Sequence, residues 1–251
     1  MRIAALYDIH GNLPALEAVL DEVHRERVDQ IVVGGDVVPG PMPRDTIDRL
    51  AQSTVPVRFI HGNGDREVLA FMSGLRTDWY RGARPEWREP IEWTAQQLEP
   101  RHQELLAGWP LTCRTDHRQL GGVLFCHATP QNDTDCFTRL TSDEQIVRLL
   151  GQVDARLVVC GHTHMQFDRT VNGIRIVNAG SVGMPFGETG AYWLLLGPDV
   201  HLRRTPYDLV TAAGGIRATD YPDVEGFAMR HVLNPPSAEQ MLDVFGRANS
   251  V

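Results

Sequence analysis

Five short clusters of residues in this 251-residue chain combine side chains that bind metal ions in proteins. Each cluster follows a short run of β-type apolar residues. Carboxylate, amide and imidazole donors together suit Mn, Fe, Zn or similar ions better than a thiolate site would. The sequence therefore favours a two-metal hydrolase, on the strength of five clusters: Asp8-Ile9-His10, Gly34-Gly35-Asp36, Gly62-Asn63-Gly64-Asp65, Cys126-His127 and Gly161-His162-Thr163-His164.

The spacing of these residues lets their side chains converge. Asp8 and His10 are two residues apart on a loop that leaves a strand, so both can point to one ion. Asp36 follows the next strand and can bridge two ions through its two carboxylate oxygens. Ligands of open α/β sheets gather beyond the carboxyl ends of the strands, where all five clusters are expected.

The same motifs, in the same order, resemble those of the calcineurin-like metallophosphoesterases. The opening, Asp8 to Asn12, resembles the bacterial branch of that family, whose first motif reads Asp-x-His-Gly-Asn. The resemblance spans residues 1 to about 205. It implies an α/β fold: a four-layer αββα sandwich with two mixed β-sheets.

The resemblance also implies a division of the ligands between two divalent transition-metal ions. Mn is the most favoured ion, and Fe, Zn, Ni or Co would also suit the donors. Such ions lie roughly 3.5–4 Å apart, and a hydroxide between them attacks phosphorus directly. The implied ligands are Asp8, His10 and His164 for the first ion, Asn63, His127 and His162 for the second, and Asp36 as the bridge.

Gly64 departs from the family pattern, because many members carry a histidine there that acts as a proton donor. A general acid contributes roughly 10²–10⁴ in rate. Arg66 could compensate by holding a phosphate oxygen, His61 could reach in from the strand end, or the substrate could have a good leaving group. We take Asp36, Asp65 and Arg66 as the catalytic candidates, and we expect Gly64→His to improve hydrolysis of alkyl esters more than of aryl esters.

Several of these residues have a simpler alternative role. Arg66 could be a surface residue paired with Asp65 or Glu67. Three residues are candidates for lining the substrate site: Asn12, which could instead cap a helix, His61, and Ser181, which could instead belong to a turn. The remaining histidines have no partners at ligand spacing and are interpreted as surface residues: His24, His102, His117, His201 and His231.

The elements that must position the site follow from the apolar pattern. Short strands over 2–7, 30–33 and 56–60 alternate with helices, the βαβ arrangement of a mostly parallel sheet. Later strands are expected over 122–126, 157–160, 174–177, 192–196 and 200–204. We expect residues 1–205 to form the metallophosphoesterase domain, with a helical insertion at about 66–111. A C-terminal helical extension over 206–251 would pack on this core or on a second subunit, in which case the protein is a homodimer.

The insertion holds four of the five tryptophans, which could be core residues or a stacking platform for a substrate. The net charge of −8 disfavours binding of long nucleic acid through a basic face. No apolar run approaches the roughly 20 residues needed to span a bilayer, and no signal-peptide core is visible. We therefore expect a cytoplasmic protein without membrane contact.

The leading hypothesis is a phosphoesterase that acts on a small phosphomonoester or phosphodiester. A protein phosphatase or a dinucleoside-polyphosphate phosphatase would use the same centre. A different class, a metal-bearing binding or scaffold module with little turnover, is favoured by Gly64 and disfavoured by the intact set of seven ligands.

Overall fold

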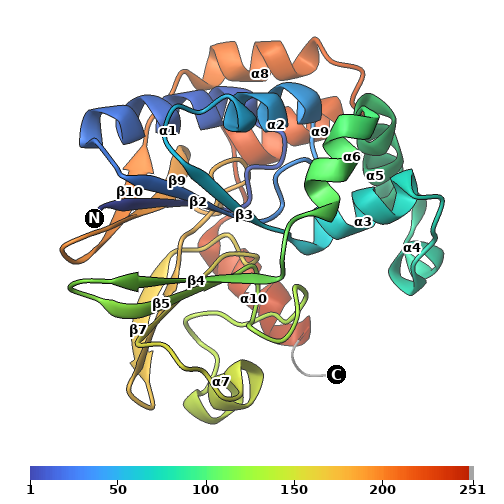
Figure 1. The fold of residues 1–251 in the computed structure, drawn as a ribbon. Coiled ribbons are helices and arrows are strands. Elements are labelled where there is room, and N and C mark those ends of the chain that lie inside the picture. The colour runs from blue at the N-terminus through green and yellow to red at the C-terminus, as the bar shows by residue number, and fades with distance from the viewer. Residues whose placement is uncertain (249–251) are drawn as a thin grey trace.

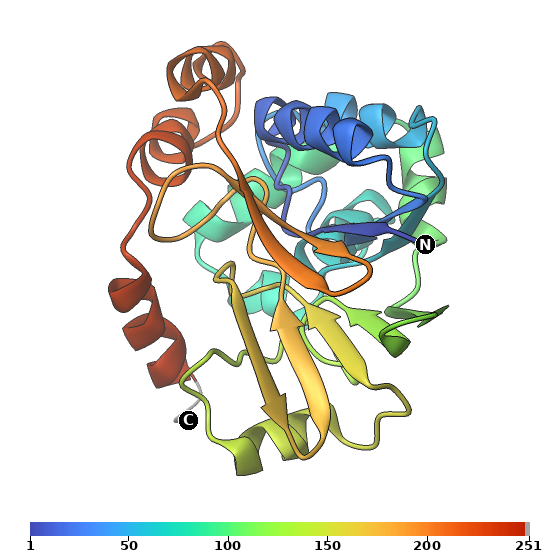
Figure 2. The same cartoon turned by 90° about the vertical axis from the view of Figure 1, so that its left-hand side faces the viewer.

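The computed structural model describes residues 1–248, whose strands form two five-stranded sheets (Figures 1 and 2). The first sheet has the order β10-β9-β1-β2-β3 and the second β4-β5-β6-β8-β7. Each contains parallel and antiparallel pairs, so both are mixed, as expected. The strands are β1 (Ile3–Leu6), β2 (Gln30–Gly34), β3 (Val57–Ile60), β4 (Thr112–His117), β5 (Gly121–Cys126), β6 (Leu157–Cys160), β7 (Phe167–Val171), β8 (Ile174–Asn178), β9 (Ala191–Leu196) and β10 (Val200–Thr205).

Alternation along β1 shows how the layers form. Ala4 and Leu6 point to a core shared with the helices, whereas Ile3 and Ala5 point to a core shared with the second sheet. A strand that is apolar on both faces must be buried on both faces. Figure 1 shows α1, α2 and α8 above the first sheet and α7 below the second. The expected four-layer αββα sandwich is therefore confirmed.

The helices cover the outer faces of the two sheets. Asn12 caps α1 by accepting from the backbone N–H of Ala15, and Pro14 lies in the first turn, where its missing N–H costs nothing. The helices are α1 (Leu13–Glu26), α2 (Pro43–Ala51), α3 (Asn63–Met72), α4 (Asp78–Gly82), α5 (Pro85–Gln97), α6 (Pro100–Ala107), α7 (Asp143–Leu150), α8 (Leu209–Arg217), α9 (Val224–Phe227), the π-helix η1 (Ala228–Leu233) and α10 (Ala238–Ala248).

The helical insertion packs beside the first sheet. Within the helical insertion expected at about 66–111, α5 and α6 are separate helices, because Pro100 begins a new helix. Trp109 stacks on Phe59 at 4.8 Å between ring centroids and belongs to the core. Trp79 and Trp87 are 44% and 58% exposed. The tryptophans therefore do not form one group.

The C-terminal extension contacts the rest of the same chain. Residues of α8, α9 and η1 form an apolar cluster that also includes Met42 and Met184, from two loops of the sandwich. Residues 249–251 of the expected extension lie outside the described residues. Across residues 1–248, none of the helices has the length and apolarity that a membrane crossing requires.

Two histidines interpreted as surface residues are buried instead. His102 is 0% exposed, and its ring nitrogens contact the backbone N–H of Glu99 and the carboxylate of Asp48. His117 is 2% exposed and lies 2.8 Å from the carbonyl oxygen of Met1. Spacing between ligands could not reveal partners of this kind, because they come from distant segments or from the backbone.

Candidate metal centre

The ends of five strands bring the polar clusters to one edge of the sandwich. Asp8 follows β1, Asp36 follows β2, and Asn63 begins α3 directly after β3. The backbone N–H of His10 donates to the carbonyl oxygen of Asp36 at 2.9 Å, so neighbouring loops are joined. From the second sheet, His127 follows β5, and the pair His162 and His164 follows β6. The centre therefore lies on the seam between the two sheets.

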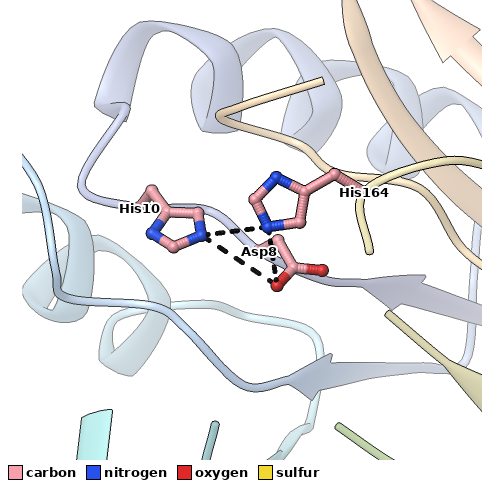
Figure 3. Close-up of side chains that lie close together, drawn as sticks. All are labelled: Asp8, His10 and His164. Carbon is pink, nitrogen blue, oxygen red and sulfur yellow. Dashed lines mark hydrogen bonds and ion pairs between the residues drawn. The ribbon is translucent and has the colours of Figure 1, made fainter. Parts of the chain in front are cut away.

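Asp8, His10 and His164 form the first group of donors (Figure 3). Asp8 Oδ1 lies 3.3 Å from His164 Nε2 and 4.0 Å from His10 Nε2. The two imidazole Nε2 atoms lie 3.3 Å apart. All three residues are at most 9% exposed. Three potential ligand atoms thus face one another in a buried space.

Hydrogen bonds fix which nitrogen of each ring faces inward. The Nδ1 atom of His10 lies 3.1 Å from the carbonyl oxygen of Pro39, and that of His164 lies 2.7 Å from the carbonyl oxygen of Met184. A carbonyl oxygen only accepts, so each Nδ1 carries the proton and each Nε2 presents a lone pair. Two lone pairs at 3.3 Å repel unless a cation lies between them. The arrangement is that of a metal site with oriented outer contacts.

Asp8 adds an oxygen that is otherwise unsatisfied. Within the described part of the chain, its Oδ1 atom is buried without a hydrogen-bond partner, whereas Oδ2 accepts from the backbone N–H of His162 at 2.9 Å. Burial alone would raise the pKa of Asp8, but the positive charges that His164 and His127 can carry lower it below its ordinary value. An orphaned buried carboxylate oxygen is a site that a cation would fill.

Asn63, His127 and His162 form the second group. His127 Nδ1 lies 2.9 Å from the carbonyl oxygen of Gly34, so its Nε2 lone pair faces inward, 3.1 Å from Asn63 Oδ1. Asn63 Oδ1 also lies 3.1 Å from His162 Nδ1. Without a cation the amide would turn its nitrogen toward both rings. A metal ion selects the orientation with the oxygen inward, so this donor set fits an ion as well.

Asp36 lies between the two groups. Its Oδ2 atom is 3.8 Å from His10 Nε2 and 3.6 Å from His127 Nε2, while Oδ1 accepts from the backbone N–H of Gly64 at 2.7 Å. One carboxylate oxygen therefore faces donors of both groups. Two groups of donor atoms within 4.8 Å of one another contain five of the expected ligands, Asp8, His10, Asp36, His127 and His164, while Asn63 lies beside His127 and His162. Their mixed O and N chemistry fits divalent cations.

Asp65 has contacts that differ from those expected of a catalytic residue. It is 1% exposed, Oδ1 accepts from the backbone N–H groups of Val37 and Val38, and Oδ2 accepts from that of Gly62. Burial, followed by the negative charge of Asp36, raises the pKa of Asp65 to about 7. Asp65 therefore connects the loops that carry the ligands. This role corrects its assignment to direct catalysis.

Arg66 and His61 are engaged by carboxylates rather than turned to a substrate. Arg66 makes a two-point contact with Asp133, at 2.8 and 3.1 Å, and a 2.6 Å contact with Glu67. His61 Nδ1 lies 3.3 Å from Asp133 Oδ2. These contacts correspond to the ion-pair alternative for Arg66, with Asp133 as an added partner, and a contact of Arg66 with a phosphate oxygen stays a prediction.

Asn12 and Ser181 hold loops together. Both are 0% exposed. Asn12 caps α1 and donates through Nδ2 to the carbonyl oxygen of Gly183 at 2.9 Å. The Ser181 hydroxyl donates to the carbonyl oxygen of Asp8 at 2.7 Å and accepts from the N–H of Met184. The expectation that these two residues line the substrate site is corrected, because their polar atoms are used inside the protein.

Gly64 has no space for a side chain. A Cβ atom built there would lie 2.6 Å from Pro39 Cγ and 3.0 Å from Asp36 Oδ1.

Two residues near the centre were not predicted from the sequence. They are Cys136, whose Sγ atom lies 3.3 Å from His162 Nε2, and Asp133, which pairs with Arg66. The one available signal for both was their place in the polar segment that directly follows His127.

Comparisons with known proteins agree with this geometry. The profile of the calcineurin-like phosphoesterase superfamily domain matches residues 1–197. The uncharacterized protein MJ0912 of Methanocaldococcus jannaschii is 26% identical over 181 residues, which are 72% of this chain and 69% of that protein.

Two solved structures are also similar to this chain. A metallophosphoesterase from Sphaerobacter thermophilus has a TM-score of 0.72 and 25% identity, over 93% of this chain and 100% of that one. The hypothetical protein PH1004 from Pyrococcus horikoshii OT3 has a TM-score of 0.77 and 19% identity, over 94% and 99% of the two chains, and shows the shared fold. Because the profile covers most of the sequence, the chain belongs to the calcineurin-like phosphoesterase superfamily and is a metal-dependent phosphoesterase.

Proposed function

We propose that the protein uses two divalent ions, with Mn the most favoured, to hydrolyse a small phosphomonoester or phosphodiester. The observation that carries this proposal is the position of Asp36, whose Oδ2 atom faces His10 of one donor group and His127 of the other. A carboxylate shared in this way supports two neighbouring ions rather than one.

The ions, when bound, supply charge that neutralises phosphoryl oxygens and lowers the pKa of water. The protein itself supplies orientation. Backbone carbonyl oxygens of Pro39, Gly34 and Met184 hold three of the imidazole rings with their Nε2 atoms inward. This arrangement directs the Nε2 atoms to the inner side, where they can bind cations without reorganisation of the rings.

The crowding at Gly64 points to the substrate class. Since Pro39 and Asp36 occupy the space around Gly64, a proton donor there would require one of these neighbours to shift. A leaving group that is stable as an anion needs little protonation. Aryl esters have such leaving groups and are the substrates we favour, and the phosphoanhydride bond of a dinucleoside polyphosphate is the alternative.

The decisive experiment measures turnover of matched nitrophenyl phosphate mono- and diesters. Purified protein is stripped of metal and then supplied with Mn²⁺, Ni²⁺, Co²⁺, Zn²⁺ or Mg²⁺ separately. We expect metal-dependent turnover with a preference between the two esters. Protein that holds two ions and turns over neither ester nor a dinucleoside polyphosphate would support the scaffold alternative, which the crowding at Gly64 also favours.

A change at Asp36 tests the shared carboxylate. We expect Asp36→Asn to lower the metal content and to reduce turnover by about 100-fold or more, since losing even an outer contact of a ligand costs roughly 10–100-fold. Elemental analysis and turnover are measured on the same samples, with Asp45→Asn, an exposed residue, as the control. Full activity in metal-depleted Asp36→Asn protein would contradict the mechanism.

A further inference from the structure

The segment over residues 129–137 contacts two ligands of the second donor group. It follows His127 and precedes α7, and below it is called the 129–137 loop. In the orientation with its oxygen inward, Asn63 Oδ1 lies 3.2 Å from the carbonyl oxygen of Asp133; both atoms are acceptors, so this is a close approach and not a hydrogen bond. Cys136 Sγ lies 3.3 Å from His162 Nε2. One loop thus reaches side chains that come from different sheets.

Cys136 takes the place of a backbone carbonyl for His162. The other three imidazoles of the centre have Nε2 inward and Nδ1 held by a carbonyl oxygen. His162 is reversed, because Nδ1 faces Asn63 and Nε2 faces the sulfur. If Nδ1 presents the lone pair, the ring proton is on Nε2 and donates to Cys136 Sγ. In that tautomer the thiol, whose S–H donates to the carbonyl oxygen of Thr134 at 3.7 Å, accepts from the ring and holds its orientation.

Asp133 anchors the loop beside Asn63. It is 5% exposed and receives the two-point contact from Arg66, with His61 Nδ1 3.3 Å away. His61 and Arg66 lie two residues before and three residues after Asn63. Two-point Arg–carboxylate contacts define geometry as well as contribute energy. The loop is thereby held against the turn that presents Asn63.

We propose that the 129–137 loop is the positioning element of two of the three ligands of the second donor group, with Cys136 orienting His162 and the Arg66–Asp133 contact holding the loop against the turn that presents Asn63. The proposal rests on the two-ion function proposed above. The other half is oriented by the carbonyl oxygens of Pro39 and Met184, which belong to other segments. Changes in the loop therefore weaken the binding of one ion and leave the other unchanged.

The test is a titration of metal-free protein with Co²⁺, followed by visible absorption and by elemental counting of bound cobalt. We expect the wild type to bind two ions. In Cys136→Ala and Asp133→Asn, we expect one ion to bind as in the wild type and the second to bind roughly 10–100-fold more weakly than in the wild type. Cys136→Ser should recover most of the lost affinity, since a hydroxyl also accepts from an imidazole N–H. Cys113→Ala, which changes another buried thiol, should match the wild type.

The proposal would be overturned if Cys136→Ala and Asp133→Asn bound both ions with wild-type affinity, or if both ions were weakened equally. It would also be overturned if Cys136→Ser bound the second ion no better than Cys136→Ala. A Cys113→Ala variant as weak as Cys136→Ala would have the same meaning. Fewer than two ions on the wild type would instead overturn the two-ion function, before any variant is compared. The two failures are therefore distinguishable.

Discussion

Five of the metal-centre residues have a backbone conformation that glycine adopts most easily. A left-handed conformation costs a residue with a side chain roughly 1–2 kcal/mol. Such residues cluster at functional sites, where surrounding structure holds them in place. The φ angles are 53° at Asp8, 50° at His10, 48° at Asp36, 63° at His162 and 58° at His164. The ligand side chains are therefore present at some expense to the stability of the metal-free fold.

This strain predicts an unusual order of stability at position 164. In metal-free protein, His164→Gly should be more stable than His164→Ala by about 1 kcal/mol, because glycine has no Cβ atom to oppose a φ of 58°. Urea unfolding in the presence of EDTA measures the difference. The same pair of changes at Ile146, which is buried in a helix, should give the opposite order. Equal stability of the two variants at 164 would show that the strain is relieved elsewhere.

The expectation that Gly64→His improves hydrolysis of alkyl esters is revised by the crowding around Gly64. Since a Cβ atom would lie 2.6 Å from Pro39 Cγ, the loop that carries Asp36 must move to admit a side chain. We now expect Gly64→His to lower metal content and to reduce turnover of aryl and alkyl esters alike. Elemental analysis and kinetics check this. Unchanged metal content with faster turnover of alkyl esters would restore the earlier expectation.

The sequence predicted the identities and order of the ligands, because their types and their positions after apolar runs are local properties. It predicted the helix cap of Asn12 as an alternative, but it could not predict the contacts that Asp65, Asn12 and Ser181 make with neighbouring loops. Which way a side chain turns depends on the arrangement of loops that are distant in sequence.

At the scale of elements, the sequence missed the two edge strands of the second sheet, β4 and β7. Central strands are apolar on both faces and stand out, as β6 does with every residue buried. β4 and β7 have charged residues on the open side, a usual feature of edge strands. Their pattern resembles that of a polar loop, so pairing with β5 and β8 had to be seen in the structure.

Helix α2 is joined to the insertion by Asp48, and this link should be pH-dependent. The Arg101 guanidinium holds the pKa of Asp48 below its usual value, and buried His102 contacts the same carboxylate at 3.1 Å. Asp48→Ala leaves the His102 Nε2–H unpaired in a buried position, so we expect a loss of about 1–3 kcal/mol near pH 7.

The sign of the pH effect follows from the lowered pKa. The charge contribution is complete above the unfolded-state pKa of about 4 and is lost as the pH falls through the folded-state value. The difference in unfolding free energy between the wild type and Asp48→Ala should therefore shrink below about pH 4. Urea unfolding across pH measures it, with exposed Asp21→Ala as the control. A difference that does not change with pH would contradict the charged link.

At the scale of the whole molecule, the centre joins the two sheets. Asp8, His10, Asp36 and Asn63 come from the first sheet, and His127, His162 and His164 from the second. Ions bound there stabilise the association of the sheets, by about 2.7 kcal/mol per site at a free concentration 100 times the Kd. For a chain of this size, we expect the melting temperature to rise by about 10–20 °C when both sites are filled.

Thermal unfolding with and without EDTA checks this coupling, and Asp36→Asn is the matched variant. The increase in melting temperature should be clearly smaller in Asp36→Asn, because the substitution replaces the shared carboxylate with a neutral amide. An equal increase in both proteins would mean that the metal stabilises the chain from another place.

The pairing of the strands also has a consequence for the order in which the protein is made. All seven ligands lie at or before His164, but β1, which leads into Asp8, pairs with β9 over Ala191–Leu196. The carbonyl oxygen of Asp8 accepts from the hydroxyl of Ser181 and the N–H of Gly183, which also come later. A chain growing on the ribosome therefore carries every metal donor before it has the strand that holds the first of them in place. We therefore expect the metal centre to be complete only after β9 has been synthesised.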